Sequence, residues 1–305
     1  MILVVGATGH LGNALIALLL RSGTHVRALT RDAKKADSLR RMGAQVYVGD
    51  LRDPESLARA CRGTDKVLAA AHSFMGAGES SPKFVDGAGN RNLIDAAKRA
   101  GIERFVFTSV AGARADHAID FFRIKFETET YLRESGLSFS ILRPSPFMDT
   151  WGAFIGEPLL KDGRTKIFGR GSNPITFVAA SDVAYFGSLA LRVPELVGET
   201  LDIGGPEPLT MNEVAASFAR FTGRSAQVTH IAPAAMHLMA GVTGTMRPAF
   251  SRQVQTAIMM DTQPMIVEMA PLLARFPFEP TRLDDFIAER YGKKTANRHS
   301  HSASA

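Results

Sequence analysis

Cysteine is almost absent from this sequence, which has one, Cys61, in 305 residues. A single cysteine excludes an intramolecular disulfide framework and a multi-cysteine zinc site, and it is typical of a reducing compartment. No apolar run is long enough to cross a bilayer, since Ala14 to Leu20 is too short, and Met1 leads into a strand-like run rather than a basic leader. We therefore expect a cytoplasmic protein that has no membrane partner.

The motifs of several enzyme classes are also missing. The eight histidines form no HExxH pattern or comparable ligand cluster, and neither a Gly-x-Ser-x-Gly elbow nor a Walker loop is present. We expect no metal site and no hydrolase of these types.

The net charge of +6 is confined to two regions. The segment from Lys293 to Ala305 has three cations and no acid, and Arg31 to Lys66 has nine cations against six acids. These two surpluses equal the whole excess and leave the rest of the chain balanced. A basic tail and a local patch explain the charge more simply than a nucleic-acid-binding face, so no nucleic-acid partner is expected.

Hydrophobic residues make up 45% of the chain and charged residues 22%, as in ordinary globular proteins. Short apolar runs alternate with helical patterns over the first two thirds. The expected strands are 2–5, 26–29, 45–48, 67–70, 105–108, 139–142, 175–178 and 200–203. The expected helices are 11–20, 33–42, 54–61, 84–100, 119–134, 182–191, 211–221 and 283–288. This alternation predicts an α/β fold with a doubly wound parallel sheet.

The rhythm breaks after Arg143-Pro144, where a Gly- and Pro-bearing stretch, Ser145 to Pro174, predicts irregular structure. We expect a smaller, α-rich C-terminal cap beside the core. The predicted division is 1–150 and 175–205 for the core, 151–174 and 206–292 for the cap, and 293–305 for a disordered tail.

Three glycines follow the first expected strand, in Gly6-Ala-Thr-Gly9-His-Leu-Gly12, and open the next helix. Glycines at this spacing allow a sharp turn, close approach of a pyrophosphate and tight packing of helix on strand. The helix N-terminus then offers amide donors and a positive dipole to the phosphates. The spacing is GxxGxxG rather than GxGxxG, but its place between strand and helix favours a dinucleotide site over a structural turn.

These residues, with Arg31, the Gly49-Asp50-Leu51 turn and Leu142-Arg143-Pro144, resemble the atypical short-chain dehydrogenase/reductases, and most of all their NmrA-like branch. That branch includes isoflavone-reductase-like enzymes, small quinone reductases and assembly factors. The resemblance covers residues 1–205 well and the remainder in outline. It implies an NAD(P)-binding Rossmann core and a cap that holds the substrate.

Arg31, with Lys35 one turn further on, follows the second expected strand. A guanidinium there favours the 2′-phosphate of NADP, whereas a carboxylate would pair with the ribose hydroxyl of NAD. NADP is therefore favoured, and NAD stays open because Asp32 is the next residue. A basic, solvated helix start is the other interpretation.

Further cofactor contacts are implied by the resemblance. Asp50 and Leu51 match the pair that flanks the adenine, while Asp53 is expected to cap the helix that starts at Pro54. His72 is expected either below the ribose and nicotinamide or at the solvent edge of its loop. The complete predicted cofactor set is Gly6, Thr8, Gly9, His10, Leu11, Gly12, Arg31, Lys35, Asp50, Leu51, Ala71, His72, Ser73 and Lys125.

Typical short-chain dehydrogenases use Tyr-x-x-x-Lys, but the matching stretch here is Phe121-Phe-Arg-Ile-Lys125. Phe121 cannot donate a proton, so dehydrogenation through a tyrosinate is not expected. The resemblance makes Lys125 the leading catalytic candidate, as a ribose contact that stabilises negative charge on an acceptor oxygen. A surface salt bridge between Lys125 and Glu129 is the structural alternative.

Ser109, after the fifth expected strand, is a second catalytic candidate, or it satisfies its own backbone. Phe147, Met148 and Trp151 lie where the family has its substrate loop. Seven of the twelve methionines fall between Met236 and Met269, which suits either core filling or an apolar pocket wall.

Two functions fit these residues. The first is an NADPH-dependent reductase that transfers hydride to a small apolar carbonyl, quinone or enone, with Lys125 supporting the oxyanion and water completing protonation. The second is a non-catalytic NAD(P)-binding redox sensor or assembly protein, for which a protein partner is expected.

Overall fold

The computed structural model describes residues 1–223, 225–243 and 247–302, with the backbone alone for 241–243 and 293–302. The chain divides into two compact units, and each is described by itself. The first unit is Met1–Pro144, Ala180–Ile203 and Thr243–Gln255, and the second is Ser145–Ala179, Gly204–Val242 and Thr256–Ala305.

The first unit is built on a seven-stranded sheet in the order β3-β2-β1-β4-β5-β6-β8, and every pair in it is parallel. Its strands are β1 (Ile2–Val5), β2 (Val26–Thr30), β3 (Gln45–Val48), β4 (Lys66–Ala69), β5 (Arg104–Thr108), β6 (Phe139–Pro144) and β8 (Thr200–Ile203). The central strands β1 and β5 are buried along their whole length. Continuous apolar runs form such strands because helices cover both faces of the sheet.

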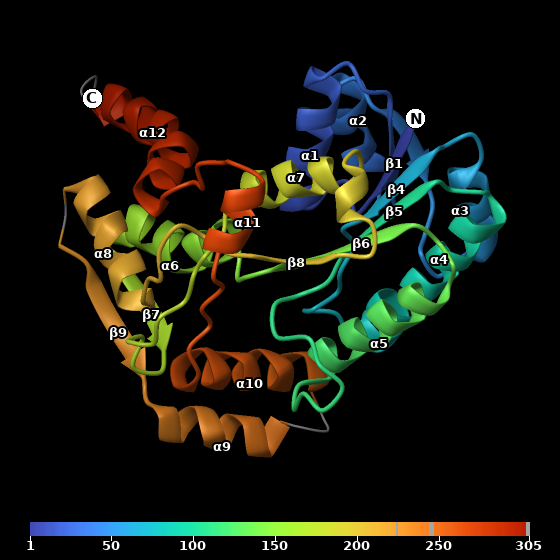
Figure 1. Ribbon diagram of the computed structural model, residues 1–305. Helices are drawn as coiled ribbons and strands as arrows, with labels where there is room; N and C mark the ends of the chain where they lie inside the picture. The colour runs from blue at the N-terminus through green and yellow to red at the C-terminus, as the bar shows by residue number, and fades with distance from the viewer. Residues whose placement is uncertain (224, 244–246, 303–305) are drawn as a thin grey trace. The chain divides into compact units, whose positions relative to one another are not determined.

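The helices of the first unit lie in two layers (Figure 1), with α1 beside α7 on one face and α3, α4 and α5 on the other. They are α1 (His10–Arg21), α2 (Ala33–Arg41), α3 (Pro54–Cys61), α4 (Asn90–Arg99), α5 (Asp120–Glu134) and α7 (Ala180–Ala190). Short 3-10 helices span Gly78–Ser80 and Pro194–Leu196, and a π-helical turn, η2, spans Lys83–Gly89. The predicted doubly wound α/β core is confirmed.

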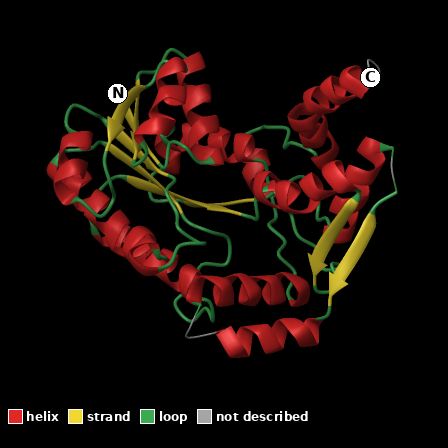
Figure 2. Cartoon of the chain, turned by 180° about the vertical axis from the view of Figure 1, so that it is seen from behind, coloured by secondary structure: helices red, strands yellow, loops and turns green. Residues whose placement is uncertain are grey.

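The second unit has a core of its own, in which Ile155, Phe177, Phe218 and Ile287 are buried together. Its elements are α6 (Met148–Asp162), β7 (Arg164–Phe168), α8 (Met211–Thr222), β9 (Gln227–Ile231), α9 (Pro233–Thr243), α11 (Ala270–Arg275) and α12 (Leu283–Ser302). The strands β7 and β9 pair in parallel as a separate two-stranded sheet (Figure 2). Helix α10 (Pro248–Thr262) begins in the first unit and ends in the second.

Two expectations between residues 145 and 178 were wrong. The stretch predicted as irregular, 145–174, contains α6 and β7. Gly156, one of the glycines on which that prediction rested, lies inside α6, where a Cβ would approach Phe218 to 2.2 Å. The expected strand 175–178 forms only isolated bridges, to Leu209, Met265 and Phe147. Its apolar side chains are explained by burial in the core of the second unit.

The C-terminal third also differs from the expected division. Thr243–Gln255 belongs with the first unit, although the sequence prediction placed it in the cap. Helix α12 continues to Ser302, beyond the point where the disordered tail was expected to start, and residues 303–305 of that tail lie outside the described residues. Among the described residues, no helix has the length and apolarity needed to cross a membrane.

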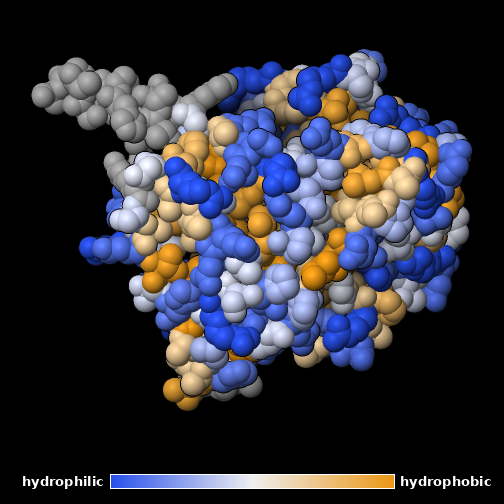
Figure 3. Space-filling model, turned by 60° about the vertical axis from the view of Figure 1, so that its left-hand side comes forward, coloured by the Kyte–Doolittle hydropathy of each residue, from blue (hydrophilic) through white to orange (hydrophobic). Residues whose placement is uncertain are grey.

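On the face drawn in Figure 3, hydrophobic residues form separate patches among hydrophilic ones.

Candidate functional site

A pocket of about 300 Å³ lies in the first unit at the carboxyl ends of β1, β2 and β4. The strand register explains its position, because Val5 is level with Leu29 on one side and Ala69 on the other. The chain segments that leave these three strands therefore meet at one edge of the sheet, where open α/β sheets bind ligands. The pocket is lined by Val5, Gly6, Thr8, Gly9, Leu29, Thr30, Arg31, Lys35, Gly49, Asp50, Leu51, Ala70, Ala71, His72 and Val85.

Two glycines of the first loop are required by close backbone contacts. Gly6 has a φ of +84°, and a Cβ on it would lie 2.5 Å from the amide nitrogen of Ala71. A Cβ on Gly12 would lie 2.3 Å from the carbonyl oxygen of Gly6. The first glycine thus turns the chain against the segment after β4, and the last lets α1 pack onto the loop.

The start of α1 forms one wall of the pocket. Its N-cap, Gly9, has no side chain to satisfy the first-turn amides, and the first intrahelical bond runs from the amide of Asn13 to the carbonyl of Gly9. Amide donors and the helix dipole there suit a pyrophosphate. Gly6, Thr8 and Gly9 line the pocket, whereas His10, Leu11 and Gly12 of the predicted cofactor set are not among its lining residues.

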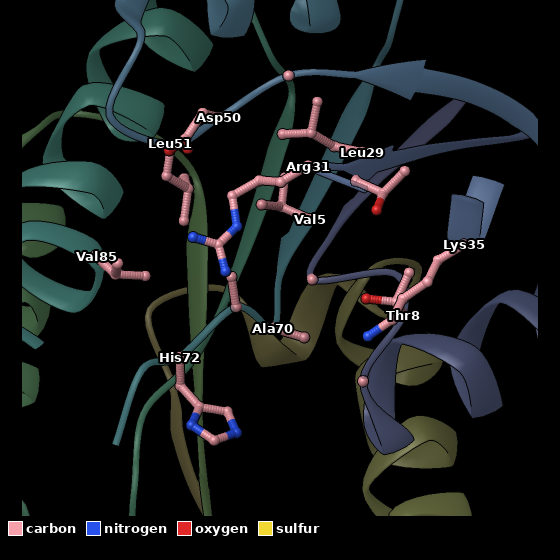
Figure 4. Close-up of a pocket in the computed structure, with 15 residues that line it drawn as sticks. Val5, Thr8, Leu29, Arg31, Lys35, Asp50, Leu51, Ala70, His72 and Val85 are labelled. Atoms are coloured by element: carbon pink, nitrogen blue, oxygen red, sulfur yellow. The ribbon is translucent and has the colours of Figure 1, made fainter. Parts of the chain in front are cut away.

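Arg31 and Lys35 give the pocket a positive side. Arg31 extends across it and Lys35 points toward Thr8 (Figure 4). Asp32 is not a lining residue, because its carboxylate caps α2 by accepting a hydrogen bond of 2.8 Å from the amide of Lys34. Asp32 is the acid that left NAD open as a cofactor in the sequence analysis, and it is thus engaged as a helix cap.

Asp50 and Leu51 line the pocket between β3 and α3, as expected for the adenine side. Hydrogen bonds from Arg52 hold the pKa of the Asp50 carboxyl below its ordinary value. Asp53 accepts a hydrogen bond of 3.0 Å from the amide of Glu55 and caps α3. The predicted cap at Asp53 is confirmed.

Ala71 and His72 line the pocket after β4, whereas Ser73 of the predicted cofactor set is not among its lining residues. The amide of Ser73 donates to Oδ2 of Asp86 over 2.8 Å. Asp86 is fully buried in η2. Sequence reasoning missed Asp86, because a lone aspartate inside an expected helix gives no signal; it was brought to this place by the π-helical turn.

Lys125 is buried and is not among the residues that line the pocket. Its ammonium lies 2.9 Å from Oδ1 of Asp86 and donates to the carbonyl oxygen of Thr108 over 2.9 Å. The alternative of a surface pair between Lys125 and Glu129 was wrong, since Lys125 pairs with Asp86 and is only 2% exposed.

Ser109 is also buried, and its hydroxyl donates to Oε1 of Glu129 over 2.5 Å. The same carboxylate accepts two hydrogen bonds from Arg143, of 2.9 and 2.6 Å. The hydroxyl is thus part of a buried network, and the pocket described above does not include it.

The three predicted substrate residues belong to the second unit. Phe147 is the N-cap residue of α6, and Met148, 2% exposed, is part of the core of that unit. Trp151 packs on the same core and contacts Phe154 edge-on. Their part in substrate binding stays a prediction.

Two other kinds of site have no support in the part of the chain that the structure describes. No three His, Cys, Asp or Glu side chains gather there in a way that could hold a metal ion. Burial raises the pKa of the Cys61 thiol to about 11, which suppresses the reactive thiolate.

A glycine-built cradle at a helix start, next to two cations at the end of β2, fits the diphosphate and ribose of a dinucleotide. The sequence model of the NmrA-like family matches residues 1–259. The chain belongs to the NmrA-like family. The predicted family and the Rossmann core are thereby confirmed.

Similar proteins include both enzymes and assembly factors. The chain is 32% identical to an NAD(P)H azoreductase of Xenophilus azovorans over 73% of this chain and 74% of that protein. It is 27% identical to the photosystem II assembly factor Ycf39 of a Synechocystis strain, over 96% of this chain and 91% of that protein. The fold is shared with the Escherichia coli quinone oxidoreductase QOR2 bound to NADPH, with a TM-score of 0.77, 21% identity, and coverage of 95% of this chain and 100% of that one.

Proposed function

We propose that this protein is an NADPH-dependent reductase that transfers a hydride to a small apolar carbonyl, quinone or enone. The observation that carries the proposal is that Arg31 and Lys35 both line the pocket while Asp32 is engaged as a helix cap. NADPH, when bound, supplies the hydride. The protein's own residues bind its phosphates and fix its orientation.

The cations select NADPH through its 2′-phosphate. A guanidinium can donate two hydrogen bonds to a phosphate, and an ammonium one turn along α2 adds a second charge. NADH lacks this phosphate and gains nothing from either residue. In this proposal Lys125 acts through Asp86: the ion pair fixes the carboxylate that holds Ser73, and with it the loop after β4.

Equilibrium binding of NADPH and NADH to the wild type and to Arg31→Ala tests the selection. We expect the substitution to weaken NADPH binding by about 1–3 kcal/mol, or roughly 5- to 150-fold, and to leave NADH binding nearly unchanged. Arg41→Ala is the matched control, because Arg41 is an exposed cation at the end of α2 that does not line the pocket. Tighter binding of NADH than of NADPH by the wild type would overturn the proposed cofactor.

The reductase activity is tested by NADPH oxidation with a panel of quinones, enones and azo dyes. The azo dyes are included because one relative is an azoreductase. Turnover of at least one acceptor, lost in parallel with NADPH binding in Arg31→Ala at low cofactor concentration, supports the reductase.

A non-catalytic NAD(P)-binding protein is the second candidate. It is favoured by Phe121, which stands where typical short-chain dehydrogenases have their tyrosine, and by the likeness to Ycf39 over nearly the whole chain. Tight NADPH binding with no turnover of any acceptor would support this candidate. The expected partner would then be sought by comparing protein complexes formed with NADP⁺ and with NADPH.

A further inference from the structure

Phe121 stands where typical short-chain dehydrogenases have the tyrosine that donates a proton, and its phenyl ring cannot donate one. Its ring is 7% exposed and packs edge-on against Phe74 and Phe122, with ring centres 5.2 and 5.8 Å apart. A reductase with this side chain needs another group to protonate the acceptor after hydride transfer.

The imidazole of His72 lies beside the ring of Phe121. Its ring centre is 6.4 Å from the ring centre of Phe121, with the planes at 71°. Unlike Phe121, His72 lines the pocket, and in Figure 4 its imidazole lies opposite Asp50 and Leu51, at the other end of the view. A group that stands next to the tyrosine position and opens into the pocket can reach a reacting acceptor there.

The loop that carries His72 is fixed from two sides. The next amide, of Ser73, is bound to Asp86, which is paired with Lys125. The carbonyl of Phe74 accepts a hydrogen bond of 2.7 Å from Arg252. A proton donor has to be held in place for efficient transfer, and these contacts provide this on the chain immediately after His72.

The other ionisable residues on the pocket wall are unsuited to giving up a proton. Arg31 and Lys35 are assigned to the 2′-phosphate, and hydrogen bonds from Arg52 hold the pKa of the Asp50 carboxyl below its ordinary value. Of the residues that line this pocket, His72 alone has an ordinary pKa close to neutrality. The ammonium of Lys125, which does not line the pocket, is engaged by Asp86 and Thr108.

We propose that His72 is the general acid of the reductase and delivers to the acceptor oxygen the proton that a tyrosine gives in typical short-chain dehydrogenases. This rests on the proposed reductase function. The reduced nicotinamide would supply a hydride, two electrons and one hydrogen. The hydride goes to the acceptor carbon of a carbonyl or enone, or to a quinone. The N–H bond of the His72 imidazolium breaks as an O–H bond forms on the acceptor oxyanion. The neutral imidazole then regains a proton from solvent.

The surroundings of His72 set the direction of its pH dependence. His72 is exposed as a whole, but desolvation of its imidazole in the pocket lowers the pKa of His72; Lys125 and His10 act in the same direction, and Asp86 opposes them. The protonated donor therefore predominates only below the ordinary value of 6.5. We expect kcat to fall as pH rises through this pKa.

The test compares His72→Gln with the wild type at saturating NADPH, because glutamine keeps a hydrogen-bonding side chain but cannot act as an acid at these pH values. We expect kcat to fall about 100- to 10,000-fold below the pKa and its dependence on pH to flatten, while the dissociation constant of NADPH stays close to the wild-type value. The pKa of the His72 ring, measured by NMR in the NADP⁺-bound protein and assigned by the signal missing from His72→Gln, should equal the pKa of the kcat profile.

His117→Gln is the matched control. His117 is another histidine of the first unit with a pKa lowered by burial, but it stacks on Phe122 and accepts a hydrogen bond from the amide of Ile119. This variant should keep the wild-type pH profile. Wild-type kcat and pH profile in His72→Gln, or a ring pKa unlike the kinetic one, would overturn the role of His72 and leave the reductase standing. No turnover of any acceptor by the wild type would overturn both.

Discussion

The ammonium of Lys125 lies 2.9 Å from Oδ1 of Asp86, and the two side chains are 2% and 0% exposed. The approach is a charge contact without hydrogen-bond geometry, since Oδ1 has no aligned donor. A pair of this kind adds little net stability, because both ions have lost their water, but losing one partner leaves the other charged and buried. The pair therefore makes the core next to the loop after β4 sensitive to either substitution.

Lys125→Met should lower the free energy of unfolding by about 3–5 kcal/mol because Asp86 is left as an unpaired buried charge. Urea denaturation at pH 7 measures this. The double variant Lys125→Met/Asp86→Asn should lose less than the sum of the two single variants, since neither charge remains. Lys98→Met, at an exposed position of α4, is the control and should change stability by less than about 0.5 kcal/mol. Strict additivity in the double variant would contradict the ion pair.

Gly12→Ala should disturb the cradle, because its Cβ would be 2.3 Å from the carbonyl oxygen of Gly6. The backbone must shift, at a cost of about 1–3 kcal/mol in stability, and NADPH binding should weaken with it. Thermal unfolding and equilibrium binding measure the two effects. Asn13→Ala, at the next and exposed position of α1, should leave both nearly unchanged. If Gly12→Ala and Asn13→Ala had the same stability and the same NADPH affinity, the close approach at Gly12 would contribute to neither.

Asp32→Ala separates the two roles that the sequence left open for this residue. As the N-cap of α2, Asp32 should stabilise the fold by about 0.5–2 kcal/mol and have no part in nucleotide selection. The variant should therefore unfold at lower urea concentration with an unchanged ratio of NADPH to NADH affinity. Asp53→Ala, which removes the cap of α3, should behave in the same way. A ratio shifted strongly toward NADPH in Asp32→Ala alone would show that the carboxylate faces the ribose.

The core could be predicted because its strands are continuous apolar runs that end in diagnostic turns. Gly6, Gly9, Arg31 and Asp50 stand directly after such strands, so their place at one edge of the sheet follows from the topology alone. Residues 175–178 were misassigned because burial in a core without a strand ladder produces the same apolar pattern. Local pattern cannot separate these cases.

The buried ion pair between Lys125 and Asp86 could not be predicted in this way. Lys125 was expected to face either ligand or solvent, but its partner, Asp86, comes from a π-helical turn 39 positions earlier in the chain. Which of several carboxylates meets a helical lysine depends on packing between η2 and α5. The same is true of Arg252, whose contacts with Asp120 and Phe74 no motif indicated.

Asp120→Asn should reveal the ion pair that holds α10 at the start of α5. Nε of Arg252 lies 2.8 Å from Oδ1 of Asp120, with the two side chains 4% and 43% exposed. Burial alone would raise the pKa of Asp120, but the hydrogen bonds and charge of Arg252 outweigh it, and the pKa lies below its ordinary value of 3.8. The stabilisation is therefore complete above 3.8 and is lost as pH falls through the lower, folded-state pKa.

The variant should be less stable than the wild type at pH 7 by about 1 kcal/mol, the modest value of a pair partly open to water. Urea denaturation between pH 7 and pH 3 should show this gap constant near neutrality and closing below the ordinary pKa, because wild-type Asp120 is then protonated as well. Asp116→Asn is the control: its carboxylate is 85% exposed and pairs with the exposed Arg114, so neither the stability nor its pH dependence should change. A gap of the same size at pH 3 as at pH 7 would mean that Asp120 stabilises the fold through packing or neutral hydrogen bonds rather than through its charge.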